Sequence, residues 1–297
     1  MKKSEWVLLT VTLCWGASYL LLKTALGAVN EFMLIGLRFG IAFLVGAAVM
    51  FPRLKKATRQ TFRFAAAQGA LLFAIGLAVS YGLKTTSTAN ASFLISLTVI
   101  FVPILSVFFL GQRMKPELTV GIGFAIAGIG LMTLKIPLSV QPGDLLCMLA
   151  ALLNATYVLV TSRAAKSVDT ISLGVLQLGF AGAYGIAFAL MTGKAALPGS
   201  GEGWAALIAL AIVGTAFCYV AQPAAQRFTT PARVGLIFSM EPVFAAVFAF
   251  VLAGELLRPQ GYAGAALVFT GVLISEYGSR WVAALRKKRG LRTEPLP

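Results

Sequence analysis

Ten apolar runs of about 20 residues follow one another along the chain, separated only by short polar connections. A helix of that length crosses the hydrocarbon core of a bilayer. With 59% hydrophobic and 12% charged residues, the chain has too little polar surface to cover a water-soluble globule. The sequence therefore predicts an all-α polytopic membrane protein with ten transmembrane helices. The runs cover residues 5–26, 32–51, 63–83, 89–111, 117–135, 143–162, 171–191, 203–224, 233–254 and 259–284.

One stretch of the chain occurs twice. Residues 92–111 align without a gap with residues 235–254, and the match continues outwards in both directions. Five helices separate the start of one copy from the start of the other, and an odd number of crossings inverts the second copy in the membrane. Two inverted five-helix repeats place a binding site at mid-membrane between them and permit alternating access. The expected divisions are a first repeat over 1–136, a second repeat over 137–285 and a basic cytoplasmic tail over 286–297.

The net charge of +15 is explained by where the basic residues lie. If the N-terminus is cytoplasmic, 19 of the 25 Lys and Arg residues lie on the cytoplasmic side, as the positive-inside rule requires. The loops on the other side hold only Lys84, Lys135, Lys194 and Arg258. We therefore expect a multi-pass protein of a bacterial inner membrane with both termini in the cytoplasm, whose basic tail contacts lipid headgroups, and no nucleic-acid partner.

Catalytic and metal-binding chemistry has little support in the composition. The chain contains no histidine, which removes His-based acid–base catalysis, haem ligation and the usual zinc sites. Cys14, Cys147 and Cys218 lie inside apolar runs without metal-type spacing, and we interpret them as small buried hydrophobes. The sequence predicts neither an enzyme nor a bound cofactor or metal.

Charged residues at depth in the bilayer are the best indicators of function. Glu241 lies about eight residues, or ~12 Å, into the ninth run. It is either a coupling group that exchanges a proton or holds a cationic substrate, or a structural carboxylate that pairs with Arg38 or Lys23 or hydrogen-bonds the backbone beside Pro242. Arg38 has the same two interpretations, whereas Lys23, near the outer end of the first run, favours snorkelling to the headgroups.

Polar and aromatic side chains recur at helical spacing on several runs. Each alone is typical of an interhelical hydrogen bond, and together they predict a polar cavity with aromatic walls. The stripes comprise Trp15, Ser18, Tyr19 and Lys23 on the first helix, Ser92, Ser96 and Val99 on the fourth, Asn154, Tyr157 and Thr161 on the sixth, and Tyr219 and Gln222 on the eighth, with Gln68 and Gln177 on the third and seventh.

These features resemble the drug/metabolite transporter superfamily, specifically its EamA-type branch. The resemblance covers nearly the whole chain and departs from the usual pattern at Gly111-Gln112, where the first repeat lacks the Gly-Glu ending. The resemblance rests on the ten-helix pattern and on the motifs Trp15-Gly16-Ala17-Ser18, Lys23, Leu37-Arg38-Phe39, Glu241-Pro242-Val243 and Gly254-Glu255. The resemblance implies a transporter of amino acids, metabolites, nucleotide sugars or toxic cations, in some members with proton exchange.

The sequence therefore favours a secondary transporter that exports a small-molecule substrate, an amino acid or related compound, by alternating access, with protons as one candidate for coupling through Glu241. Two alternatives stay open: a multidrug exporter of organic cations, and an uncoupled facilitator or channel. The oligomeric state is also open. The expected substrate-binding residues are Trp15, Ser18, Tyr19, Arg38, Ser96, Asn154, Tyr157, Tyr219, Gln222 and Glu241.

Overall fold

The computed structural model describes residues 2–86, 91, 94–133, 141–253 and 259–288, and these ranges contain helices and connections but no strand. The helices correspond to the ten predicted runs, and the all-α polytopic membrane class is confirmed. Six helical stretches in the described residues are both long and apolar enough to cross a membrane, two of them spanning more than one of the elements given below, and shorter apolar helices accompany them. The elements are α1 (Lys3–Ala28), α2 (Glu31–Leu54), α3 (Arg59–Thr85), α5 (Thr98–Leu110), α6 (Pro116–Thr133), α7 (Pro142–Ala164), α8 (Thr170–Met191), α9 (Gly201–Ala211), the π-helical turn η1 (Ile212–Phe217), α10 (Cys218–Gln226), α11 (Pro231–Phe238), α12 (Glu241–Ala253) and α13 (Pro259–Lys288).

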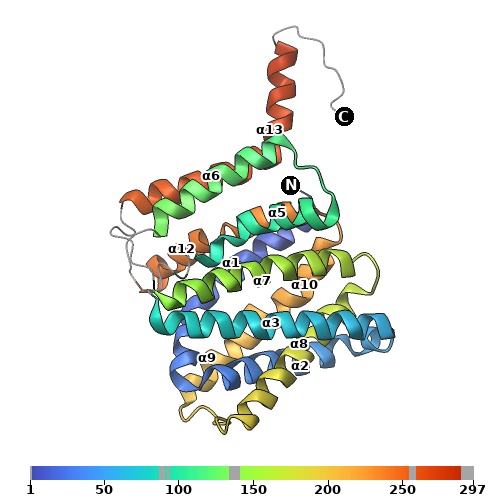
Figure 1. The fold of residues 1–297 in the computed structure, drawn as a ribbon, viewed down its shortest axis with the longest axis vertical. Coiled ribbons are helices and arrows are strands. Elements are labelled where there is room, and N and C mark those ends of the chain that lie inside the picture. Colours follow the sequence, from blue (N-terminus) through green and yellow to red (C-terminus); the bar gives the residue numbers. More distant parts are fainter. Residues whose placement is uncertain (1, 87–90, 92–93, 134–140, 254–258, 289–297) are drawn as a thin grey trace.

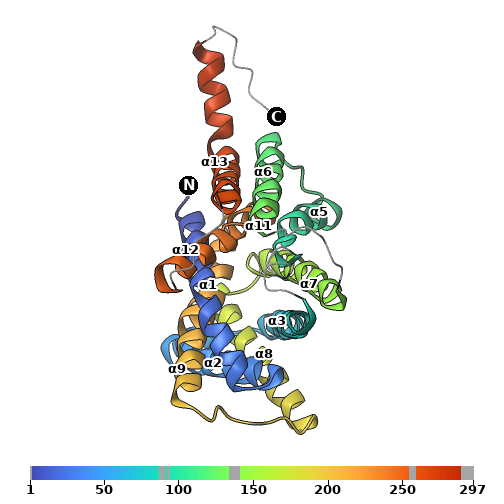
Figure 2. The same cartoon turned by 90° about the vertical axis from the view of Figure 1, so that its left-hand side faces the viewer.

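The helices lie side by side across Figure 1, and Figure 2 views several of them nearly end-on. We call the end of the bundle at which α1, α3, α6, α8 and α11 begin the N-terminal side, and the other end the opposite side. The pair α6–α13 forms one edge of the bundle in both views, and α2 packs against α8 near the other edge.

The pattern of contacts between helices stays the same when the two halves of the chain are exchanged. The α3–α7 contact corresponds to the contact of α1 with α9 and α10, and the α1–α12 contact corresponds to α7–α5. The pairs α2–α8 and α6–α13 each join equivalent helices of the two halves. This is the contact pattern that an inverted repeat produces. The expected boundary at 136–137 and the tail beyond Lys288 lie outside the described residues, and α13 continues as a helix through 286–288.

Two of the transmembrane segments are broken. The sequence predicted continuous helices at both places. The fourth is interrupted at Leu97 just before α5, and the ninth at residues 239–240 between α11 and α12. These breaks coincide when the repeats are aligned at their offset of 143. Pro242 explains the second break, because it has no N–H to donate to the carbonyl of Phe238. At the first break the Thr98 hydroxyl donates instead to the carbonyl oxygen of Ile95, at 2.7 Å.

Glycines permit the closest helix contacts, as their spacing predicts. A Cβ atom at Gly128 of α6 would lie 2.5 Å from the carbonyl oxygen of Gly264 in α13, and a Cβ at Gly264 would lie 2.5 Å from that of Gly128. The same reciprocal contact joins Gly121 and Gly271, and Gly36 meets the backbone of α8. No side chain fits at these positions unless the helices separate.

Gly128→Ala should therefore destabilise the protein by about 1–3 kcal/mol, because its methyl group overpacks the α6–α13 contact. The apparent melting temperature in detergent, followed by size-exclusion chromatography of heated samples, measures this loss. Gly123→Ala on the same helix is the matched control, since a Cβ there meets no atom within 4 Å. A Gly128→Ala protein as stable as Gly123→Ala would contradict the packing assignment.

Candidate functional site

The π-helical turn η1 presents a backbone carbonyl to the first half of the chain. Side chains in and after this turn hydrogen-bond carbonyls five residues back: Thr215 Oγ1 donates to Leu210 O at 2.9 Å, and Cys218 Sγ to Val213 O at 3.2 Å. The oxygen of Gly214 accepts a hydrogen bond from Trp15 Nε1 of α1 at 3.1 Å and one from an Arg38 Nη2 of α2 at 3.4 Å. A Cβ on Gly214 would collide with the Ser18 hydroxyl, so this approach requires glycine.

Arg38 is held at this turn by a second hydrogen bond. Its Nε donates to Thr215 Oγ1 at 2.6 Å, and its guanidinium lies 5.3 Å from the centroid of the Phe39 ring. The residue is half-buried and lies about 10 Å along α2 from the opposite side, too deep to reach water easily by extending along the helix. The structure thus fixes a cation near the middle of the bundle.

An aromatic group surrounds the side chain of Tyr219. Its ring centroid lies 5.5 Å from Trp15, 5.6 Å from Phe39 and 6.0 Å from Tyr157, and these rings come from four different transmembrane segments. Trp15 also packs edge-on against Phe238 of α11 at 4.9 Å. The predicted aromatic residues Trp15, Tyr157 and Tyr219 are therefore brought together, next to Arg38.

Two glutamines connect further helices beside this group. The Tyr157 hydroxyl donates to Gln177 Oε1 at 3.0 Å, and Gln177 Nε2 donates to the carbonyl of Tyr219 at 2.9 Å. One turn further along the same face of α7, Gln68 Nε2 donates to Thr161 Oγ1 at 3.0 Å. Gln177 is thus an interhelical hydrogen-bonding residue, and so is Gln68 through its amide nitrogen.

Glu241 is the first residue of α12, directly after the break in the ninth segment. It lies about 15 Å along that segment from the N-terminal side, and its depth is therefore close to that of Arg38. Its carboxylate interacts electrostatically with Arg38 and Tyr219. An anionic and a cationic group thus lie within electrostatic reach of each other at mid-bundle, beside the aromatic group.

The remaining predicted site residues are more dispersed. The Ser18 hydroxyl donates to Cys14 O within α1 at 2.6 Å while it faces Gly214, and Asn154 is half-buried one turn before Tyr157. Gln222 is fully buried one turn beyond Tyr219. The side chains of Tyr19 and Lys23 lie outside the described residues.

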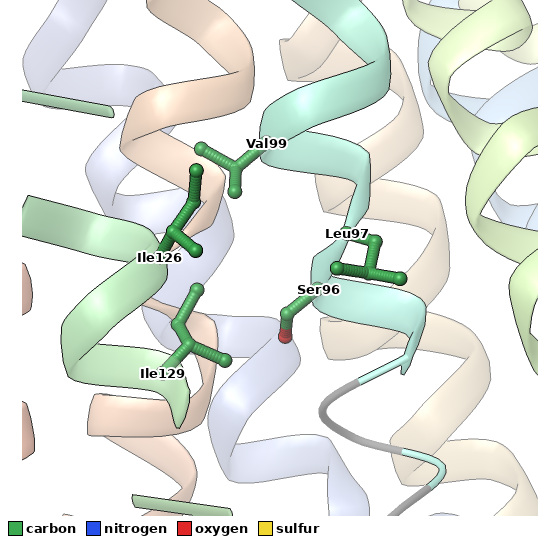
Figure 3. A pocket seen from close by; sticks show the side chains of 5 residues that line it. All are labelled: Ser96, Leu97, Val99, Ile126 and Ile129. Atoms are coloured by element: carbon green, nitrogen blue, oxygen red, sulfur yellow. The ribbon is translucent and has the colours of Figure 1, made fainter. Parts of the chain in front are cut away.

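Ser96 lies in a separate pocket. The residues on its side are Leu97 and Val99, and Ile126 and Ile129 of α6 line the other side (Figure 3). Apart from the Ser96 hydroxyl, this lining is apolar. Ser96 therefore differs from Trp15, Ser18 and Arg38, which contact η1.

Sequence reasoning missed Gly214, Thr215 and Phe39, which complete the surroundings of Arg38. A Gly-Thr pair inside an apolar run was the available signal, but nothing in it indicates a π-helical turn. Within the described residues, no group of three or more Cys, Asp or Glu side chains is arranged to hold a metal ion.

Comparison with known proteins decides the family. The model of the EamA-like transporter family matches residues 2–134 and again residues 141–277. The chain belongs to the EamA-like transporter family. The resemblance to the EamA branch of the drug/metabolite transporters is thereby confirmed, and this EamA-like protein is a membrane transporter, a class of protein that is not normally enzymatic.

Two relatives agree with this assignment, and a solved structure shares the fold. Two proteins of Archaeoglobus fulgidus, each named "Uncharacterized transporter", are 26% identical to this EamA-like chain. The first alignment covers 85% of this chain and 90% of the relative, and the second covers 89% and 82%. A solved structure titled "Crystal structure of protein" superposes with a TM-score of 0.78 at 21% identity, covering 94% of this chain and 98% of that one, and it supports the fold alone.

Thr215→Val should destabilise this EamA-like transporter by about 1–3 kcal/mol, because Arg38 Nε loses its acceptor in a partly buried setting. Thr215→Ser keeps the hydroxyl and is the matched control, expected to remain near the wild-type melting temperature. Equal melting temperatures for the two variants in detergent would show that the hydroxyl does not hold Arg38.

Proposed function

We propose that this EamA-like transporter exports a small zwitterionic metabolite, an amino acid or related compound, from a bacterial cell by alternating access. The observation that carries the proposal is that Arg38 and Glu241 lie at similar depth near mid-membrane, within electrostatic reach of each other, with uncharged polar and aromatic side chains around Arg38. A guanidinium suits a carboxylate, and a carboxylate with neighbouring ring faces suits an ammonium group. A zwitterion satisfies both charges at once.

The broken fourth and ninth segments support the alternating-access part of the proposal. Discontinuous helices at the midplane of inverted repeats are typical of secondary transporters. Glu241 and its repeat equivalent Thr98 are the first residues after the two breaks, so the duplicated scaffold does not itself require a carboxylate there. We assign the N-terminal side to the cytoplasm on the distribution of Lys and Arg in the loops.

A panel of ligands tests the substrate class. Binding raises the melting temperature of the purified protein as the ligand concentration exceeds its dissociation constant. Amino acids should produce a selective shift, whereas quaternary ammonium compounds should not. A shift with organic cations alone would favour the drug-exporter alternative, in which Glu241 and the aromatic rings bind a cation and Arg38 has only a structural role.

Reconstituted vesicles distinguish a carrier from a channel. For the amino acid that stabilises the protein, unlabelled compound inside the vesicles should accelerate uptake of labelled compound, because both must use the same alternating site. Flux that is neither saturable nor accelerated in this way would support an uncoupled facilitator or channel.

Glu241→Gln should abolish the dependence of transport on a pH gradient while substrate exchange continues, because the amide cannot exchange a proton. Gradient-driven flux and exchange, measured in the same vesicle preparation, give the two readouts. Glu202→Gln removes an exposed carboxylate at the start of α9 and is the matched control. Unchanged gradient dependence in Glu241→Gln would exclude this residue as the coupling group.

A further inference from the structure

Buried polar atoms without hydrogen-bond partners gather toward the N-terminal side of the bundle. Gln222 and Gln226 of α10 are both fully buried, and neither amide atom of either side chain has a partner in the structure. Buried polar groups in native proteins are nearly always paired, so each exception needs an explanation. The hydroxyl oxygens of Ser4, Ser162 and Thr229 share this property.

Helix register places these groups near one another. Gln222 and Gln226 are one turn apart and share a face of α10 with Cys218, whose Sγ lies 3.8 Å from the carbonyl oxygen of Val11 in α1. Because α1 and α10 run in opposite directions, two turns from this contact bring Gln226 to the level of Ser4. Thr229 follows the end of α10, and Ser162 lies near the end of α7, which packs against α10 and α11.

This cluster, which we call the glutamine cluster (Ser4, Ser162, Gln222, Gln226 and Thr229), is not a general property of buried polar residues in the bundle. Gln177 is equally buried, yet both of its amide atoms are paired with Tyr157 and Tyr219. Among the described residues, the one other such atom is Gln68 Oε1 of α3, whose amide nitrogen is paired with Thr161, the neighbour of Ser162. Gln177 shows how a structural glutamine has both amide atoms paired.

An ion pair closes the membrane face beside the glutamine cluster. Glu5 is fully buried next to Ser4, and its Oε1 accepts a hydrogen bond from Nη1 of Arg233 in α11 at 2.7 Å. Arg233 Nη2 also lies 3.5 Å from the carbonyl oxygen of Ser275 in α13. The pair therefore ties α1 to α11 and α13 at the end of the bundle where the cluster lies.

We propose that the glutamine cluster is the closed form of a polar passage that leads from the N-terminal side to the central site, and that it binds the hydrogen-bonding groups of a small polar substrate in transit. The inference rests on the transport function proposed above. Carboxamides donate to a carboxylate and accept from an ammonium group, so they suit a zwitterion or a neutral polar compound and add nothing for a lipophilic cation. When the passage opens, water and substrate supply the missing partners, and this offsets the loss of the closed packing.

Reactivity with a charged thiol reagent tests the passage without knowledge of the substrate. Gln222→Cys and Gln226→Cys are introduced into a chain whose native cysteines are replaced by alanine, and sealed vesicles of each orientation are treated with the membrane-impermeant reagent MTSET. Both cysteines should react from the N-terminal side at least tenfold faster than from the other. Ala225→Cys is the matched control, because Ala225 is equally enclosed but packs in an apolar cluster, and it should stay unlabelled.

Labelling at Gln222 and Gln226 no faster than at Ala225, or equal from both sides, would overturn the passage. If labelling is one-sided, the reactive face also reports the orientation of the chain. Reaction only from the extracellular face would leave the passage intact while refuting the cytoplasmic placement in the proposed function. The two proposals can therefore fail separately.

The thermal stability of leucine variants separates a passage from a structural role. Gln222→Leu and Gln226→Leu remove unpaired polar atoms and should leave the melting temperature unchanged or raise it, whereas Gln177→Leu breaks two hydrogen bonds and should lower it by several degrees. A loss in the first two variants as large as in Gln177→Leu would assign the cluster to structure and overturn the proposal.

Glu5→Gln weakens the closing ion pair and should speed the MTSET reaction of Gln226→Cys severalfold. An unchanged rate would mean that this pair does not close the passage. Arg163→Gln, on the exposed end of α7, is a charge-changing control that should leave the rate unaltered.

Discussion

The carbonyl oxygen of Gly214 joins the two halves of the transporter at mid-membrane. Lipid offers no hydrogen-bond partner, so irregular backbone at this depth persists only where protein or a water-lined cavity satisfies it. The π-helical turn meets this requirement with two side chains of the first half, the Trp15 indole and the Arg38 guanidinium. The position of Arg38, and with it the aromatic group around Tyr219, follows from this irregular turn.

The duplicated scaffold carries different interactions at its two ends. Glu5 and Asp144 are both the third residue of the first helix of their half, and each accepts a hydrogen bond from the backbone nitrogen just before that helix. On the opposite side Asp144 accepts a hydrogen bond from the Thr86 hydroxyl. On the N-terminal side Glu5 pairs with Arg233, and the hydroxyl of Thr229, the repeat equivalent of Thr86, has no partner. Symmetry of the fold therefore does not give symmetry of the contacts at these two equivalent positions: Glu5 takes a charged partner, whereas Asp144 takes a hydroxyl.

The sequence predicted the features that depend on length and spacing. Ten spans follow from the bilayer thickness, and the Gly128–Gly264 contact follows from small residues recurring on one helix face. The irregular turns could not be predicted in this way. Pro242 marks one break, but Leu97 has no such signal, and Ile212–Phe217 is as apolar as a regular helix. Gly214 and Thr215 become site residues only because η1 turns them toward Arg38, a tertiary contact between residues far apart in sequence.

The central network and the glutamine cluster differ in how many of their polar atoms have hydrogen-bond partners. This difference affects the balance between the two conformations of an alternating-access protein. The central network around Gln177 is paired on every side, which fixes a single arrangement of α7, α8 and α10. The glutamine cluster keeps unpaired amides in the closed state, and each one raises the free energy of that state relative to an open, hydrated one. A carrier needs two conformations of similar free energy, because a closed end that is too stable would trap the substrate. Unpaired polar groups at one end lower the free-energy difference without adding a charge to the membrane interior, where charge is far more costly.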